Sequence, residues 1–309
     1  MDAKGLAAIA LLVLAAGEVS PQPVSPQFRV RVDAVRVDAL VTHGGQPVGG
    51  LTIDQFELFD NGVRQRIETL TAEQVPVSVV VVFDVSQSMA GERLASVGEA
   101  GRALVEMLRP VDRASILEFS DQITQTVPFT TERPRLLDGL RRLTSGGGTS
   151  LYDAVYAGLS LGEADDSRSL LLVLSDGADT ASWLSATAVE DSAKRSESVI
   201  YAVTASAGAN RPVDLLMRNP NRRWRSGELT RASSRNTFLS QITQATGGRL
   251  LHVGDDDLAK TFSGILKEFQ ARYLLTYFPT EPHTAGWHDI TLRLKLRGAD
   301  VQAKRGYWR

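Results

Sequence analysis

Residues 77–91 read VSVVVVFDVSQSMAG, and the abrupt change of character inside this stretch decides the fold. Its first part, Val77 to Phe83, is a continuous and largely apolar run, which is typical of a strand buried on both faces of a sheet. One carboxylate and two hydroxyls, from Asp84, Ser86 and Ser88, follow at alternating positions. We therefore expect these three side chains on the loop that the strand feeds.

The segments around this strand alternate between further buried strands and helices. Strands are expected at 113–119, 169–174, 199–203 and 249–253, and helices at 93–108, 134–143, 150–161, 186–196, 237–245 and 257–270. Such alternation predicts an α/β domain over residues 76–272, with a doubly wound, mostly parallel, Rossmann-like sheet that is covered by helices on both faces. In sheets of this kind, ligands bind beyond the carboxyl ends of the strands.

Both ends of the chain show a different pattern, in which apolar and polar residues alternate. One predicted face carries Val35, Val37, Ala39 and Val41, and DITLRLKLR places Ile290, Leu292, Leu294 and Leu296 inside. Asp60-Asn61-Gly62 between two such runs predicts a tight hairpin, because Asn-Gly tolerates the positive φ of a two-residue turn. We expect antiparallel strands at 28–75 and 273–309 that pack together as a small β-sandwich-like module.

The first residues have the features of an export signal. A lysine precedes an apolar stretch from Leu6 to Ala16, and Ala15-Ala16-Gly17 resembles a cleavage site. Because a membrane span takes about 20 apolar residues, we interpret 1–20 as a secretory signal peptide and 21–27 as a proline-rich linker. An uncleaved membrane-surface anchor is the alternative. The mature protein is then expected to be periplasmic or extracellular, without an integral membrane span.

The amino-acid composition excludes disulfide bonds and argues against nucleic-acid binding. The chain has 309 residues, a formal net charge of -2 and no cysteine. Disulfides are therefore excluded, and nucleic-acid binding is not expected because it requires a pronounced basic excess. Residues 206–236 are an exception, with seven arginines and Trp224. Such a run indicates a solvated insertion, and Trp224 keeps a partner-binding patch as the second interpretation.

Oxygen-bearing side chains suited to a hard metal ion are expected on three loops at one edge of the central sheet. Asp84, Ser86 and Ser88 follow the first parallel strand, Thr149 lies in SGGGTS before a helix, and Asp176 follows the strand SLLLVL. This donor set suits Mg²⁺ or Mn²⁺, whereas zinc recruits histidine or cysteine. Hydroxyl ligands leave the ion most of its positive charge, so an open position would attract an Asp or Glu of a protein partner.

The same residues resemble a known family. The D-x-S-x-S loop with a separate Thr and a separate Asp is similar to the metal-ion-dependent adhesion site of von Willebrand factor type A (VWA) domains. By this resemblance, Ser86, Ser88 and Thr149 would bind the metal directly, and Asp84 and Asp176 directly or through water. The resemblance also implies that ligand binding could couple to a shift of the last helix, 257–270.

The flanking sequences resemble the exported bacterial "VWFA-related domain" proteins, in which the type A domain is embedded between terminal strands. The stretches that carry this likeness are GLTIDQFELFDNGVRQRIETL before the domain, and YLLTYFP and GWHDITLRLKLRGADVQAKRGYW after it. The implied function is non-catalytic protein binding or cell adhesion in the bacterial envelope.

Other readings of the oxygen cluster stay open on the sequence alone. The main alternative is a metal-dependent hydrolase or phosphatase-like enzyme, although an aspartyl-phosphate phosphatase would want a carboxylate where Ser86 stands. A P-loop would need a lysine after the glycines, and a serine hydrolase would need one of the four histidines, His43, His252, His283 and His288, as a base. The serines could also simply cap a helix, with no metal.

The aromatic and histidine residues near the C-terminus are not expected to form a site. We interpret His283 and His288 as surface residues, and Trp287, Tyr307 and Trp308 as core or edge aromatics of the terminal strands.

Overall fold

The computed structural model describes residues 34–309, except 73–74, 164–166, 206–236, 255–256 and 281–284. The expected signal peptide, the linker, the first strand from Phe28 and the arginine-rich segment lie outside the described residues. The remaining chain, from Asp33 onward, forms one compact unit.

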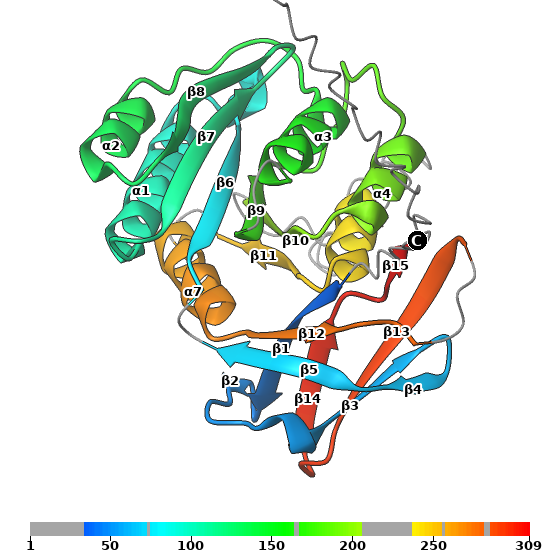
Figure 1. Ribbon diagram of the computed structural model, residues 1–309. Helices are drawn as coiled ribbons and strands as arrows, with labels where there is room; N and C mark the ends of the chain where they lie inside the picture. Colours follow the sequence, from blue (N-terminus) through cyan, green and yellow to red (C-terminus); the bar gives the residue numbers. More distant parts are fainter. Residues whose placement is uncertain (1–33, 73–74, 164–166, 206–236, 255–256, 281–284) are drawn as a thin grey trace, which may run out of the picture. The chain divides into compact units, whose positions relative to one another are not determined.

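A six-stranded sheet is the centre of the structure (Figure 1). Its strands, in spatial order, are β11 (Leu250–Val253), β10 (Val199–Ala205), β9 (Arg168–Leu174), β6 (Val77–Asp84), β7 (Arg113–Phe119) and β8 (Ile123–Thr130). All pairings are parallel except β7 with β8, which is antiparallel. The expected α/β fold with a mostly parallel sheet is therefore confirmed, with one antiparallel edge strand, β8, that the sequence did not predict.

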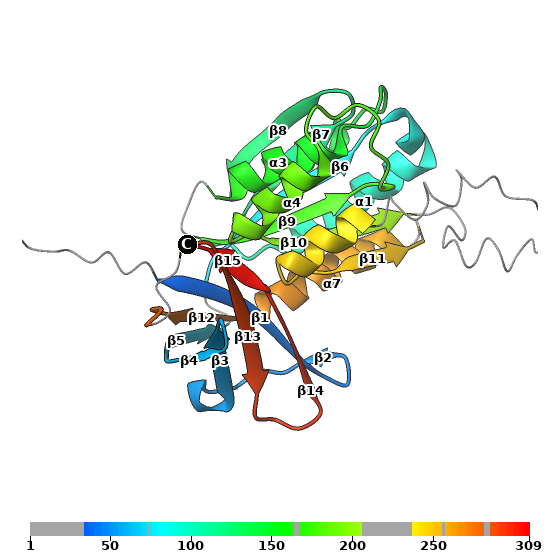
Figure 2. The same ribbon diagram turned by 90° about the vertical axis from the view of Figure 1, so that its right-hand side faces the viewer.

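Helices cover both faces of this sheet, as the views in Figure 1 and Figure 2 show. On one face lie α1 (Glu92–Met107), α2 (Arg133–Arg141) and α7 (Leu258–Gln270); on the other lie α3 (Leu151–Gly162), α4 (Ala186–Arg195) and a helix over 237–245. Strand β6 is buried along its whole length and sends alternate side chains, such as Val81 and Val82, into the two cores. This explains why its sequence does not alternate between apolar and polar residues.

Strands from the two ends of the chain pair in two antiparallel sheets. One has the order β14-β1-β12-β5 with β2 paired to β1, and the other has the order β15-β13-β3-β4. The strands are β1 (Val35–His43), β2 (Gln46–Pro47), β3 (Phe56–Asp60), β4 (Val63–Gln65), β5 (Ile67–Ala72), β12 (Tyr273–Tyr277), β13 (Trp287–Leu294), β14 (Ala299–Ala303) and β15 (Gly306–Trp308). Apolar side chains of both sheets form one core cluster. Asn61 and Gly62 make the β3–β4 turn with φ of 47° and 80°.

Two expectations for the terminal strands were wrong. Leu296 was placed inside, but β13 ends at Leu294 and Leu296 is 39% exposed, because the chain turns toward Gly298, whose φ is +76°. His288 was interpreted as a surface residue, yet it is fully buried, and its Nδ1 lies 2.8 Å from Oδ1 of the equally buried Asp60. His283 lies outside the described residues.

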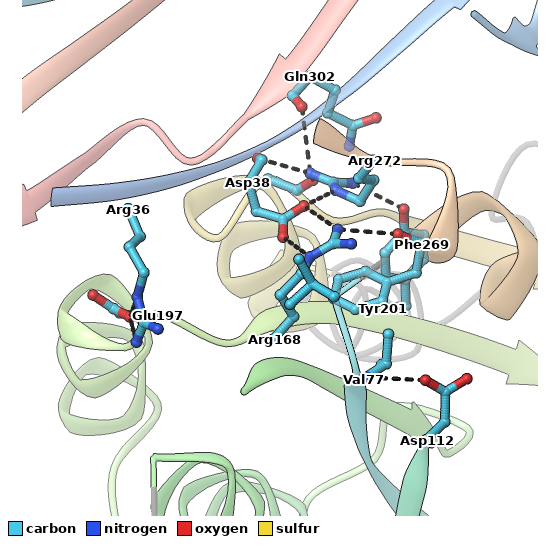
Figure 3. Close-up of polar contacts among 12 residues, drawn as sticks. Arg36, Asp38, Val77, Asp112, Arg168, Glu197, Tyr201, Phe269, Arg272 and Gln302 are labelled. Carbon is cyan, nitrogen blue, oxygen red and sulfur yellow. Dashed lines mark hydrogen bonds and ion pairs between the residues drawn. The ribbon is translucent and has the colours of Figure 1, made fainter. Parts of the chain in front are cut away.

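A buried ion-pair cluster joins β1 to the central domain (Figure 3). Oδ2 of Asp38 accepts a hydrogen bond from Nε of Arg168 at 2.8 Å, and Oδ1 accepts one from Nε of Arg272 at 2.7 Å. The two arginine side chains are only 3% and 0% exposed. Burial raises the pKa of the Asp38 carboxyl, but the charges and hydrogen bonds of both arginines outweigh it and hold the pKa below its usual value.

Candidate functional site

Asp84, Ser86 and Ser88 lie at the carboxyl end of the central strand β6; Ser86 and Ser88 are on the loop after it, as expected, whereas Asp84 still belongs to the strand. Asp84 is the last residue of the strand and is fully buried, Ser86 is 1% exposed, and Ser88 is exposed within the short 3₁₀ helix Gln87–Met89. Oδ1 of Asp84 accepts a hydrogen bond from the Ser86 amide at 2.9 Å, and the Ser86 and Ser88 hydroxyl oxygens lie 3.0 Å apart. The loop thus brings one carboxylate and two hydroxyls together.

Backbone hydrogen bonds bind this loop to the glycine-rich loop before α3. The Gly146 amide donates to the Val85 carbonyl at 2.8 Å, and the Gln87 amide donates to the Gly147 carbonyl at 3.1 Å. Thr149, the sequence-predicted ligand from the second loop, follows two residues later. Main-chain hydrogen bonds therefore hold the glycine-rich loop, which carries Thr149, against the Asp84 loop.

The loop after β9 is bound to the same place by two kinds of contact. The amides of Thr180 and Ala181 donate to the Thr149 carbonyl at 2.8 and 3.0 Å. Ser175 is buried, and its hydroxyl donates to Oδ2 of Asp84 at 2.7 Å. The structure therefore brings together the three loops that carry the five predicted ligands. Ser175 was not predicted; the only available signal was its position directly before Asp176 in the SDG stretch.

Thr149 shows an unsatisfied polar atom inside the site. The residue is 5% exposed, and its main-chain amide and carbonyl are both hydrogen-bonded, the amide donating to Oγ1 of Thr180 at 2.9 Å. Within the described part of the chain, however, its side-chain hydroxyl has no hydrogen-bond partner. A buried hydroxyl without a partner is costly and rare, so this oxygen calls for a ligand.

Asp176 contributes negative charge close to the Asp84 carboxylate. Asp176 is half-buried, and its Oδ1 accepts a hydrogen bond from the Ala178 amide at 2.9 Å. Burial raises the pKa of the Asp84 carboxyl, and the negative charge of Asp176 raises it further, against the hydrogen bonds from Ser86 and Ser175 that lower it. A nearby cation would relieve both effects.

The donor set fits a small hard cation. Around an octahedral ion with ligands at 2.0–2.1 Å, neighbouring ligands lie about 2.8–3.0 Å apart. The Ser86 and Ser88 oxygens, 3.0 Å apart, have this spacing. No group of three or more His, Cys, Asp and Glu side chains that could hold a metal occurs among the described residues. A transition-metal site of that kind is thus not found there, whereas mixed hydroxyl and carboxylate oxygens suit Mg²⁺ or Mn²⁺.

The arrangement does not match that of a serine hydrolase. In the described structure, the Ser86 hydroxyl contacts the Ser88 hydroxyl and the Asp84 carboxylate, and no hydrogen bond joins either serine to a histidine. His252 and His288 pair instead with Thr204 and Asp60. A nucleophilic serine needs a base within hydrogen-bond reach, and neither loop serine has one here.

Comparison with known proteins identifies the central domain. Residues 79–178 match the family model of the von Willebrand factor type A domain, and this stretch contains all five predicted ligands. The chain carries a VWA domain. The solved structure of a von Willebrand factor type A protein from Catenulispora acidiphila is similar to the described fold, with a TM-score of 0.51, 12% identity, and coverage of 91% of this chain and 75% of that one. At this identity, the likeness concerns the fold alone.

Two curated proteins are similar to parts of this VWA protein. Inter-alpha-trypsin inhibitor heavy chain H2 of Mesocricetus auratus is 24% identical over 159 residues, which are 46% of this chain and 16% of that protein. A UPF0353 protein of Mycolicibacterium paratuberculosis is 33% identical over 86 residues, 26% of each chain. The match thus spans about a sixth of the first relative and about a quarter of the second.

Among the described residues, no helix is long and apolar enough to cross a membrane.

Proposed function

We propose that the VWA domain is a non-catalytic, divalent-metal-dependent binding domain that captures an Asp or Glu side chain of a protein partner. The observation that carries this proposal is the buried Thr149 hydroxyl, which has no partner among the described residues and belongs to the loop bound to those of Asp84 and Asp176. Ser86, Ser88 and Thr149 would hold Mg²⁺ or Mn²⁺ directly, and Asp84 and Asp176 directly or through water.

The chemistry of the ligands explains why a carboxylate is the favoured partner group. A bound divalent ion supplies positive charge and an open coordination position to the surface of the domain. Ser86, Ser88 and Thr149, which would bind the ion directly, are neutral, so the ion would keep most of its positive charge where Asp84 and Asp176 act through water. A carboxylate oxygen of a partner could fill the open coordination position and neutralise the remaining positive charge of the ion.

The flanking segments extend the proposal. We place the protein outside the cytoplasm, periplasmic or extracellular, on the basis of the signal-like sequence at 1–20. The two terminal sheets, which share one apolar core, would form a β-sandwich-like module that carries the VWA domain, as in the exported VWFA-related proteins that the flanks resemble.

A metal titration by calorimetry tests the site. Thr149→Val removes the hydroxyl and little else, and Asp84→Ala removes a carboxylate; Thr243→Val is the matched control, since Thr243 is equally buried but donates its hydroxyl to the Leu239 carbonyl. Wild type and Thr243→Val should bind Mg²⁺ or Mn²⁺, and the two site variants should bind about tenfold or more weakly. Absence of binding by wild type at millimolar metal, or equal binding by all variants, would contradict the assignment.

A turnover assay separates binding from catalysis. We expect no metal-dependent hydrolysis of p-nitrophenyl phosphate or p-nitrophenyl acetate by the wild-type protein. Hydrolysis that requires Mg²⁺ and disappears in Asp84→Ala would show that the same cluster is an enzyme active site.

A further inference from the structure

Trp183 is the most exposed large hydrophobic side chain in the described part of the chain. It is 96% exposed, whereas the next one, Val111, is 58% exposed. Tryptophan is enriched at the energetic centres of interfaces, where its large ring is buried against a partner. Such a side chain in full contact with water therefore needs an explanation from its surroundings.

The exposure does not result from a loosely held loop. The amides of Trp183 and Leu184 donate to the two carboxylate oxygens of Asp153 on α3, each at 2.9 Å. The preceding Ser182 accepts a hydrogen bond from the Tyr152 amide at 3.0 Å and donates its hydroxyl to Asp179 at 2.5 Å. The main chain on both sides of the indole is thus fixed to the first turn of α3, and binding through this ring would cost little conformational entropy.

Trp183 also follows closely after a segment that is bound to the loop of the proposed metal ligand Thr149. Ala181, two residues earlier, donates its amide to the Thr149 carbonyl at 3.0 Å. Two residues of chain span at most about 7 Å, which limits the distance between the Cα atoms of Ala181 and Trp183. One short segment of a partner, at about 3.3 Å per residue, could therefore reach both the site and the indole with three to five residues.

The charges that contact the Trp183 loop indicate which kind of partner group would bind the indole. The Asp153 carboxylate is hydrogen-bonded to the Trp183 main chain, and Asp179 holds the side chain next to it. The hydrogen bonds to both carboxylates come from uncharged donors: two backbone amides for Asp153, and a backbone amide and the Ser182 hydroxyl for Asp179. An exposed aromatic ring on a loop that is bound by two carboxylates favours a cationic group of a partner over a neutral one.

We propose that Trp183 is a specificity-determining contact of the VWA domain, which stacks against a Lys or Arg side chain of the partner. This inference rests on the proposed function: the partner segment presents an Asp or Glu to the metal site and, three to five residues away, a basic side chain to Trp183. Asp153 and Asp179 add electrostatic attraction and hold the loop in the binding conformation.

Synthetic peptides on a Gly-Ser background test this pairing. Each peptide carries one Glu and, three, four or five residues away, Arg, Lys, Leu or Ser, and its binding to the purified chain is measured in Mg²⁺ and in EDTA. Wild type should bind the Arg and Lys peptides about 2- to 30-fold more tightly than the Ser peptides, in Mg²⁺ only. Trp183→Ala should lose this preference but keep the dependence on Glu and Mg²⁺, and Trp183→Phe should keep part of it.

The controls separate the role of Trp183 from the proposed metal-dependent binding itself. Trp308→Ala removes another exposed tryptophan, 44% exposed and on β15, and should behave as wild type. Acrylamide quenching gives a second readout: a bound Arg peptide should protect wild-type fluorescence, and Trp183→Phe should lose this protection. An unchanged preference in Trp183→Ala, or a preference for Leu peptides, overturns the role of Trp183 alone. If no Glu peptide binds in a Mg²⁺-dependent way, the proposed function itself fails, and this inference falls with it.

Discussion

Replacement of Asp38 by asparagine should strongly destabilise the protein. The carboxylate is hydrogen-bonded to Arg168 at 2.8 Å and to Arg272 at 2.7 Å, and neither arginine side chain is more than 3% exposed. An amide keeps one acceptor for one arginine but turns its two N–H donors toward the other arginine, which water cannot reach. Removal of one partner from a buried ion pair costs about 3–5 kcal/mol, so we expect a loss of this size in the free energy of unfolding.

Urea unfolding, followed by far-UV circular dichroism and tryptophan fluorescence, measures this loss. The matched control is Asp138→Asn, because Asp138 pairs with Arg141 at 2.5 Å but both side chains are about 60% exposed. Such an exposed pair contributes at most about 1 kcal/mol. If Asp38→Asn lowers the free energy of unfolding no more than Asp138→Asn does, then water or rearranged side chains must stabilise the two arginine charges. The argument from burial would then be wrong.

Three further predictions concern helix packing, the metal and acid. Gly158→Ala should lower the free energy of unfolding by about 1–3 kcal/mol, because the added methyl would lie 2.6 Å from a leucine methyl on β9. Gly264→Ala, which has nothing within 4 Å of the added methyl, should instead raise the free energy of unfolding by up to about 1 kcal/mol in the same urea assay, because alanine favours the helix α7 more than glycine does. Asp84→Asn should raise the melting temperature of the metal-free protein, because a pKa that is higher in the folded state means that the ionised carboxylate opposes folding at neutral pH. Mg²⁺ should raise the melting temperature of the wild-type protein but not that of Asp84→Asn. Burial raises the pKa of Asp112, but hydrogen bonds from its arginine and backbone partners hold it below the usual value, as at Asp38. Stability from both groups should be present above about pH 4 and fall as the pH drops below it, with a flatter acid limb in Asp38→Asn.

The central fold could be predicted because its strands are buried on both faces. A strand such as β6, with every residue buried, leaves a sequence signal that no surface element shares. β8 was missed because it is an edge strand in which only one residue is buried, and it has two register shifts against β7, so neither burial nor alternation marks it in the sequence. His288 was misjudged for a related reason: its burial depends on Asp60, which is distant in sequence and adjacent only in the folded chain.

For the candidate site, the sequence could predict the loops but not the contacts between them. Asp84 and Asp176 follow parallel neighbouring strands, so the sheet alone brings their loops to one edge. The roles of Ser175 and Asp153 could not be predicted in this way, because each is defined by side-chain hydrogen bonds to a segment that is distant in sequence. The unsatisfied Thr149 hydroxyl is likewise visible only once every neighbour is in place.

The way the three loops are joined bears on how the site would work. The Asp84 loop, the glycine-rich loop and the loop after β9 are connected mainly through backbone amides and carbonyls, and through the Ser175 hydroxyl. Because these bonds join protein groups to one another, we expect them to hold the Ser86, Ser88 and Thr149 oxygens in position whether or not an ion is bound. A site of this kind would not need to fold around its metal, in contrast to domains in which metal binding supplies the folding energy. We therefore expect EDTA to abolish partner binding while the protein stays folded, with little change in its circular dichroism spectrum; unfolding on addition of EDTA would show instead that the ion itself holds the loops together.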